Sequence, residues 1–280
     1  MADPKTILIT GSTDGLGRAC AADLATQGAA LLVHGRDEYR ARATCEQLRV
    51  EANNERVHVY VADLSSLEAV RRLAAQVEAG EERLDVLVNN AGIALGEGQR
   101  RLSKDGYELT FAVNYLSHFL LTRLLLPMLE RSAPARIINV ASIGQAPIDF
   151  DDVMLEHSYE PFRAYAQSKL AQIMFTFELA ERLGDSSVTV NALHPATLMD
   201  TKMVRDTFGR SMTSVEEGKQ ATLRLISSPE LDGVTGSYFN GTSEARADEQ
   251  AYEPEARRSL WELSEALCGL QASGSGLRLG

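Results

Sequence analysis

The feature that most constrains the fold of this 280-residue chain is a repeated alternation of short β-branched runs with longer helical segments. Each run is a brief apolar stretch, which is typical of parallel strands covered on both faces. Alternation repeated this often predicts right-handed crossovers and one α/β, doubly wound parallel sheet with helices on both faces. The expected strands are 5–10, 30–34, 56–62, 83–89, 135–141, 187–193 and a short seventh at 236–240; the expected helices are 15–27, 38–52, 66–79, 104–130, 161–183 and 214–227.

Two of these helices begin with capping signals. Asp37 is placed to cap the helix over 38–52, and "SSLE" from Ser65 to Glu68 fits a capping box for the helix that follows. No linker divides the chain, so we expect one Rossmann-type nucleotide-binding domain over 1–270, its last helix lying within 251–270. The small and polar residues of 271–280 predict a flexible C-terminal tail.

A glycine-rich loop, "TGSTDGLGRA", follows the first expected strand directly. Glycines between a strand and a helix let the backbone turn tightly and approach a pyrophosphate, which then rests on the N-terminal dipole of the helix. Gly11, Gly15 and Gly17 therefore predict a dinucleotide site. Their spacing differs from the common G-x-G-x-x-G and leaves Ser12 and Thr13 in the loop, where their hydroxyls are expected to meet phosphates.

The end of the second expected strand, "LLVHGRDEYR", bears on which nicotinamide cofactor is accepted. An acid here bonds the ribose 2′-hydroxyl of NAD, whereas an arginine suits the 2′-phosphate of NADP. Gly35 occupies the position of the acid, and Arg36 follows it. Asp37 is the competing ribose ligand, although we assign it to the helix cap. NADP (NADPH) is therefore favoured, with NAD as the alternative.

Tyr165 and Lys169 lie four residues apart in "FRAYAQSKLAQIMF", within the expected helix 161–183. This spacing places both side chains on one face of a helix. Taken alone, such a pair is most often two solvated surface neighbours, and the other motifs must decide whether it has a chemical role.

Composition limits the partners of the chain. A net charge of −11 and a pI near 5.0 argue against nucleic acid and anionic membranes. The N-terminus lacks a signal-peptide pattern, and no apolar run reaches the roughly 20 residues of a membrane span. Five histidines without metal-ligand spacing predict no metal. Three scattered cysteines fit a reducing, cytoplasmic location.

The glycine loop, "NNAG" at 89–92 and "YAQSK" at 165–169 resemble, in this order, the short-chain dehydrogenase/reductase family. The resemblance runs from about Lys5 to Gly241. In the long stretch at 143–162 the chain is similar to the retinol-dehydrogenase-like and carbonyl-reductase branches, and this insert is expected to shape substrate access. The resemblance implies hydride transfer between a nicotinamide and a carbonyl or alcohol carbon of a small molecule.

Position by position, the resemblance also implies roles for individual residues. Asp63 would bond the adenine amino group, and the "NNAG" residues would line the cofactor. The implied catalytic residues are Asn114, Ser142, Tyr165 and Lys169. The implied cofactor-binding residues are Gly11, Ser12, Thr13, Gly15, Leu16, Gly17, Arg36, Asp63, Leu64, Asn89, Ala91, Gly92, Tyr165, Lys169, Pro195 and Thr201.

These catalytic roles give the Tyr165–Lys169 spacing a chemical reason. Carbonyl reduction needs a proton on oxygen, and a tyrosine hydroxyl is a suitable donor with an ordinary pKa of about 10. A nearby ammonium, here that of Lys169, is expected to lower that pKa and also to bond the cofactor ribose. Ser142 would stabilise charge on the carbonyl oxygen, and Asn114 would hold a water that relays protons.

The segment after the sixth expected strand, "HPATLMDTKM", matches the family pattern least well. Ala196 replaces the usual glycine, and Thr201 falls one residue later than the usual threonine that holds the nicotinamide amide. Thr197 is the other candidate. We expect 197–212 to form a mobile substrate lid.

The leading expectation is an NADP(H)-dependent oxidoreductase acting on a carbonyl or secondary alcohol. The alternatives are an NAD-dependent dehydrogenase, a carbon–carbon double-bond reductase and a non-catalytic cofactor-sensing protein. The resemblance also implies a homodimer or homotetramer formed through the helices at 104–130 and 161–183. Their phenylalanines either supply that interface or face the sheet: Phe111, Phe119, Phe175 and Phe177.

Overall fold

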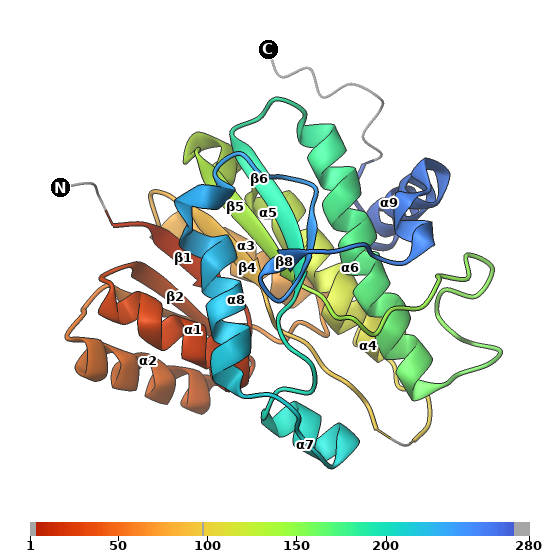
Figure 1. Ribbon diagram of the computed structural model, residues 1–280, viewed down its shortest axis with the longest axis horizontal. Coiled ribbons are helices and arrows are strands. Elements are labelled where there is room, and N and C mark those ends of the chain that lie inside the picture. The colour runs from red at the N-terminus through yellow and green to blue at the C-terminus, as the bar shows by residue number, and fades with distance from the viewer. Residues whose placement is uncertain (1–3, 97, 272–280) are drawn as a thin grey trace.

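A single sheet of eight strands organises the chain in the computed structural model, which describes residues 4–96 and 98–271. The strands are β1 (Thr6–Ile9), β2 (Ala30–Gly35), β3 (Val57–Val61), β4 (Val86–Asn89), β5 (Ala135–Val140), β6 (Val188–His194), β7 (Tyr238–Asn240) and β8 (Ser243–Glu244). Their order is β3-β2-β1-β4-β5-β6-β7-β8. Strands β1 to β7 run parallel and β8 pairs antiparallel with β7, so the expected doubly wound α/β sheet is confirmed (Figure 1).

Helices cover both faces of this sheet, as Figure 1 shows. They are α1 (Gly15–Thr26), α2 (Glu38–Ala52), α3 (Leu67–Gly80), α4 (Leu109–Phe111), a π-helical turn η1 (Ala112–Leu116), α5 (Ser117–Arg131), α6 (Pro161–Leu183), α7 (Lys202–Phe208), α8 (Val215–Ser227), the 3₁₀ turns η2 (Pro229–Leu231) and η3 (Glu249–Tyr252), and α9 (Pro254–Leu267). One apolar core lies between the sheet and α1, α2 and α8. The other lies beneath α3, α5, α6 and α9.

Most expected boundaries agree with the structure, and the differences have local causes. Asp37 caps α2 as expected, its Oδ1 accepting from the amide of Arg40 at 2.8 Å. The cap of α3 is Ser66 rather than Ser65, because the amide and hydroxyl of Ser65 both bond to Asp63. Strand β8 and helix α7 were not expected, since two and seven residues are too short to show a clear period.

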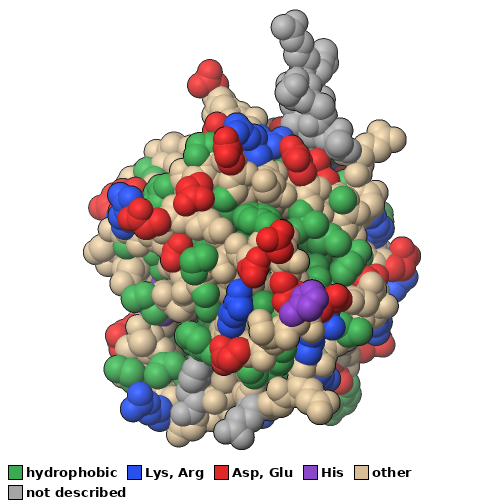
Figure 2. Space-filling model, turned by 90° about the vertical axis from the view of Figure 1, so that its right-hand side faces the viewer, with side chains coloured by type: hydrophobic (Ala, Val, Ile, Leu, Met, Phe, Trp, Pro, Cys, Tyr) green, Lys and Arg blue, Asp and Glu red, His purple; other side chains and the backbone are tan. Residues whose placement is uncertain are grey.

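The last helix, α9, packs across α6 and α5. The Trp261 ring lies 5.2 Å from that of Phe119 and 5.9 Å from that of Phe175, measured between centroids. Phe177 contacts Tyr252 at 5.3 Å. Of the two roles left open for these phenylalanines, packing within the chain is the one that the structure shows for Phe119, Phe175 and Phe177, and the expected homodimer or homotetramer stays a prediction. Figure 2 shows this side of the molecule, where hydrophobic side chains lie among scattered acidic and basic ones.

The stretch Leu109–Arg131 is long and apolar enough, by length and composition alone, to cross a membrane. No segment of that length was expected from the sequence. Of the apolar 18-residue window in this stretch, 72% is buried inside the protein, as is usual for the core helix of a sheet protein. Of the expected C-terminal tail, residues 272–280 lie outside the described part of the chain.

Candidate active site

The expected site residues gather at the carboxyl ends of the central strands. The glycine loop follows β1, "NNAG" begins in β4, Ser142 follows β5, and Pro195 follows β6. Strand β1 pairs with β2 on one side and β4 on the other, so successive connections leave the sheet in opposite directions at this point. In doubly wound sheets that reversal opens the crevice in which ligands bind.

The glycine loop and the "NNAG" segment touch each other closely. A Cβ on Gly17 would lie 2.4 Å from the carbonyl oxygen of Gly11 and 2.5 Å from Nδ2 of Asn90, so only glycine fits there. Asn90 donates through that Nδ2 to Gly11 at 3.2 Å. The 12-residue helix α1 starts at Gly15, just after this contact, and presents its N-terminus to the crevice. Such a cradle of close backbone and helix terminus suits a pyrophosphate.

Two polar side chains expected at the cofactor are buried and engaged elsewhere. Oγ of Ser12 accepts from the backbone amide of His34 at 2.9 Å, so the expectation that this hydroxyl meets a phosphate is wrong for this structure. Nδ2 of Asn89 donates to Thr122 at 2.9 Å and to Asn139 at 2.8 Å inside the sheet. The Asn89 side chain has no exposed surface, so it joins strands rather than lining a ligand.

The end of β2 leaves no room for an NAD-type acid. A Cβ on Gly35 would lie 2.6 Å from Cγ2 of Thr13, which is packed against that glycine. Arg36 is exposed next to it and makes no ion pair within the described ranges 4–96 and 98–271. The carboxylate of Asp37 is engaged in capping α2.

Asp63 and Leu64 follow β3 on the same side of the sheet. Oδ1 of Asp63 accepts from the hydroxyl of Ser65 at 2.8 Å, and its Oδ2 lies 3.0 Å from Nζ of Lys104. Leu64 is buried. Asp63 is half-buried and stands at the edge where an adenine contact was expected, although Lys104 already neutralises its charge.

Tyr165 and Lys169 share one face of α6, with Nζ of Lys169 5.7 Å from the centre of the Tyr165 ring. Nζ donates to the carbonyl of Val140 at 2.8 Å and to Oε1 of Gln172 at 2.9 Å. Burial lowers the pKa of Lys169 to about 7. The amine is thus fixed beneath Tyr165 by two neutral oxygens.

Tyr165 is half-buried, and Ser142, two positions beyond the end of β5, lies near enough to the phenol to affect its pKa. Burial raises the pKa of Tyr165, and the Ser142 hydroxyl acts in the opposite direction. This differs from the expectation that the Lys169 ammonium lowers the pKa of Tyr165, since the amine is bonded to Val140 and Gln172 instead. Ser142 is the group that favours the phenolate here.

The position of Ser142 depends on residues that the sequence did not indicate. Tyr238 of β7 donates its hydroxyl to the Ser142 carbonyl at 3.0 Å, and Gln145 donates to the same oxygen at 3.0 Å. The amide of Gly144 donates to Oγ of Ser142 at 3.1 Å. These bonds fix the backbone of Ser142 and the position of its Oγ.

Asn114 lies in the π-helical turn η1, a local irregularity that is frequent at functional sites. Its Oδ1 accepts from the Ile93 amide at 2.8 Å, and its Nδ2 donates to the Ile93 carbonyl and to Ser168 Oγ, both at 3.0 Å. A Cβ on Gly92 would lie 3.4 Å from that Oδ1 and 3.7 Å from Nζ of Lys169. The side chain therefore holds the loop after "NNAG" beside the lysine, and its water relay stays a prediction.

A cavity of about 420 Å³ opens beside Tyr165. Its wall on one side is the start of α6, and on the other the loop after "NNAG" and helix α7. Thr207 of α7 donates to the Ala94 carbonyl at 3.2 Å, which joins α7 to that loop. The lining residues are Ala94, Leu95, Gly96, Gly98, Glu160, Pro161, Phe162, Tyr165 and Thr207. The expected lid at 197–212 is thus partly helical, and its mobility stays a prediction.

The structure separates the two threonines proposed for the nicotinamide amide. Thr201 caps α7, and its methyl group would lie 3.2 Å from a Cβ on Gly15. Thr197 is exposed and bonds His194 at 3.0 Å between Oγ1 and Nε2. Thr201 is therefore the threonine that reaches the glycine loop, and Pro195, just after β6, is buried.

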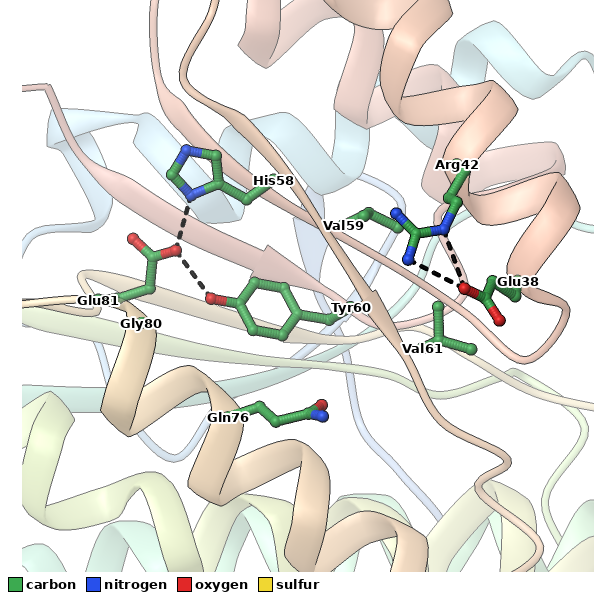
Figure 3. A pocket seen from close by; sticks show the side chains of 9 residues that line it. All are labelled: Glu38, Arg42, His58, Val59, Tyr60, Val61, Gln76, Gly80 and Glu81. Carbon is green, nitrogen blue, oxygen red and sulfur yellow. Dashed lines mark hydrogen bonds and ion pairs between the residues drawn. The ribbon is translucent and has the colours of Figure 1, made fainter.

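A larger hollow of about 550 Å³ lies at the edge strand β3, between α2 and α3 (Figure 3). Glu81 accepts there from Tyr60 and pairs with His58, both at 2.8 Å. Strands β2, β1 and β4 separate β3 from β5, so this hollow is apart from Tyr165 and Ser142. Within the residues described, no cluster of three or more histidine, cysteine or acidic side chains suits a metal ion.

Comparisons with known proteins agree with this geometry. Residues 5–210 match the short chain dehydrogenase family. Human retinol dehydrogenase 14 is 40% identical over 95% of this chain and 87% of its own length, and human retinol dehydrogenase 13 is 38% identical over 96% and 86%.

Solved structures show the same fold. An uncharacterized protein from Mycobacterium paratuberculosis superposes with a TM-score of 0.77 at 30% identity, covering 95% of this chain and 94% of that one. RhlG from Pseudomonas aeruginosa, solved as an NADP active-site complex, gives 0.69 at 28% identity over 84% and 94%. The chain therefore belongs to the short-chain dehydrogenase/reductase family of NAD(P)-dependent oxidoreductases.

Proposed function

We propose that this chain is an NADP(H)-dependent oxidoreductase that interconverts an apolar carbonyl compound and its alcohol, with Tyr165 as the general acid and base. The observation that carries the proposal is the grouping of three side chains beside the 420 Å³ cavity: Tyr165 lines its wall, Ser142 acts on the pKa of that tyrosine, and the buried Lys169 amine lies 5.7 Å from the centre of the Tyr165 ring. A general acid (Tyr165), a hydrogen-bond donor for an oxyanion (Ser142) and an amine (Lys169) thus lie together beside a cavity that a substrate oxygen can enter.

Each residue has a defined task in carbonyl reduction. NADPH, when bound, would supply the hydride for the carbonyl carbon. Tyr165 gives its proton to the carbonyl oxygen as negative charge develops there, and the Ser142 hydroxyl donates a hydrogen bond to that oxygen. In its protonated form, Lys169 places a positive charge next to the tyrosine that is losing its proton. Gly11, Gly15 and Gly17 would hold the pyrophosphate.

The preference for NADP rests on the end of β2. Gly35 has no room for an acid, and Arg36 is exposed with a guanidinium suited to a 2′-phosphate. The NADP complex of the similar protein RhlG supports this choice. NAD is the alternative, and it would need Asp37 to leave the α2 cap.

The substrate class follows from the cavity wall. Ala94, Leu95, Pro161 and Phe162 give it an apolar surface, and the carboxylate of Glu160 is engaged by the amides of Phe162 and Arg163. The names of the similar retinol dehydrogenases support an apolar aldehyde or alcohol of the retinoid kind. A role as a non-catalytic cofactor sensor is disfavoured because the serine, tyrosine and lysine all stand in register.

A titration tests the proposal before any substrate is known. Nicotinamide fluorescence should report tighter binding of NADPH than of NADH, and NADPH should then be oxidised by apolar aldehydes but not by their carboxylated analogues. Tighter NADH binding would indicate that Asp37, rather than Arg36, recognises the adenosine ribose of the cofactor. Binding of neither cofactor would remove the enzymatic proposal and leave only the fold.

A further inference from the structure

His34, near the end of β2, is a buried residue with a side chain directed at the glycine loop. It is 2% exposed. Its Nδ1 lies 3.0 Å from the amide nitrogen of Gly11, and its Nε2 lies 3.2 Å from the carbonyl oxygen of Ala62. The ring therefore spans from the loop after β1 to the residue just beyond β3.

These two partners determine which nitrogen carries the proton. A backbone amide can only donate, so Nδ1 accepts from Gly11, and a carbonyl can only accept, so Nε2 donates to Ala62. The imidazole is neutral in this arrangement. Burial lowers the pKa of His34 to about 4, in agreement with a ring that stays neutral near physiological pH.

The Gly11 peptide is held from both sides. Its amide donates to His34 and its carbonyl accepts from Asn90. Gly11 has a φ of +67°, a left-handed conformation that L side chains rarely adopt. The neighbouring Ser12 exchanges bonds with the His34 backbone, its amide donating to the His34 carbonyl at 2.9 Å. The loop conformation thus depends on contacts with β2.

The second partner links the ring to the adenine side of the crevice. Ala62 directly precedes Asp63 and Leu64, which follow β3 at the edge expected to receive the adenine. The His34 ring bonds to both segments, so it fixes the distance between the glycine loop and the segment that begins at Ala62. No catalytic task described above uses His34.

We propose that His34 is a positioning residue of the cofactor site: by accepting from Gly11 and donating to Ala62, it holds the glycine loop in the form that receives the pyrophosphate. This proposal rests on the proposed cofactor binding. The Gly11 contact is the one that acts on the pyrophosphate, and the Ala62 contact orients the ring.

Two near-isosteric variants separate the contacts. In His34→Asn, Oδ1 takes the place of Nδ1 and keeps an acceptor for Gly11. In His34→Gln, the side-chain amide reaches the place of Nε2 and keeps a donor for Ala62, but leaves the half-buried Gly11 amide without its acceptor. His34→Leu removes both contacts.

The measurement is the NADPH dissociation constant from fluorescence, with the urea midpoint of each variant recorded alongside. His34→Gln and His34→Leu should bind NADPH roughly tenfold or more weakly than wild type, because the Gly11 amide loses its acceptor and the loop loses its fixed form, whereas His34→Asn should stay within about threefold. Turnover at saturating NADPH should change little, which places the effect in cofactor binding. Equal affinities in all three variants, or the order reversed between Asn and Gln, would overturn the proposal.

A measurement on the wild-type protein keeps the proposal testable if a variant fails to fold. Nitrogen-15 spectra should show His34 as the Nε2–H tautomer with and without NADPH. An Nδ1–H tautomer would contradict the Gly11 contact. If the wild-type protein does not bind NADPH at all, the proposed function fails, and that result is distinct from unequal binding among the variants.

Discussion

The amine of Lys169 donates to Oε1 of Gln172 at 2.9 Å, and Nε2 of that amide lies 3.1 Å from Nδ1 of His118. All three side chains are buried, and no carboxylate is bonded to the amine among the residues described. Burial lowers the pKa of His118 to about 3, so the histidine is neutral. The cation beneath Tyr165 is therefore held by neutral partners, which is why its charge is sensitive to pH.

This arrangement predicts a pH dependence of stability. Lys169 has a pKa of about 7 in the native state and about 10.4 when unfolded. Between these values the unfolded chain binds more protons, so the free energy of unfolding rises with pH, by at most about 1.4 kcal/mol per pH unit from this group. Below about pH 7 the full cost of the buried charge is present. Urea unfolding at pH 7 and pH 9 measures the gain.

Lys169→Met is the matched variant, since it keeps an unbranched chain and removes the charge. Other titrating groups change alike in both proteins, so the wild type should gain stability relative to Lys169→Met between pH 7 and pH 9. Parallel pH profiles for the two proteins would show that the lysine keeps an ordinary pKa.

Arg36→Leu should change cofactor preference. Loss of the guanidinium should weaken NADPH binding about tenfold, the scale of one charge-assisted phosphate contact, and leave NADH binding unchanged. Arg40→Leu is the control, because Arg40 is another exposed arginine of the same segment. Equal losses of NADPH and NADH affinity in Arg36→Leu would indicate damage to the site rather than loss of phosphate recognition.

Trp261→Ala should destabilise the fold. Trp261 is 4% exposed and packs on Phe119 and Phe175, and truncation of a buried tryptophan costs about 3–5 kcal/mol. Tyr39→Ala, at a position 83% exposed on α2, should change stability little. Denaturant unfolding measures both. If Trp261→Ala unfolds at the same denaturant concentration as the wild type, Trp261 does not anchor α9 against α5 and α6.

Local patterns were enough to predict the strands, the larger helices and the position of the nucleotide loops. Short apolar runs and helical periods extend over neighbouring residues, so β1 to β7 and the larger helices were recognisable. The Asp37 cap was recognisable for the same reason, because its partner Arg40 is three residues away.

The contacts that complete the site join residues far apart in the chain. His34 meets Gly11 across 23 positions, His118 meets Gln172 across 54, and Tyr238 meets Ser142 across 96. No local period indicates such pairs, because they depend on which strands become neighbours. The same reason explains Ser12, whose hydroxyl was assigned to a phosphate but bonds the neighbouring strand.

The central claim is that Tyr165 transfers the proton, and Tyr165→Phe tests it most directly. The substitution removes only the hydroxyl, so NADPH affinity should match that of the wild type. Single-turnover oxidation of bound NADPH by an apolar aldehyde should slow by a factor of about 10² to 10⁴, the usual contribution of a general acid. Turnover within a few-fold of the wild type at equal NADPH occupancy would contradict the account.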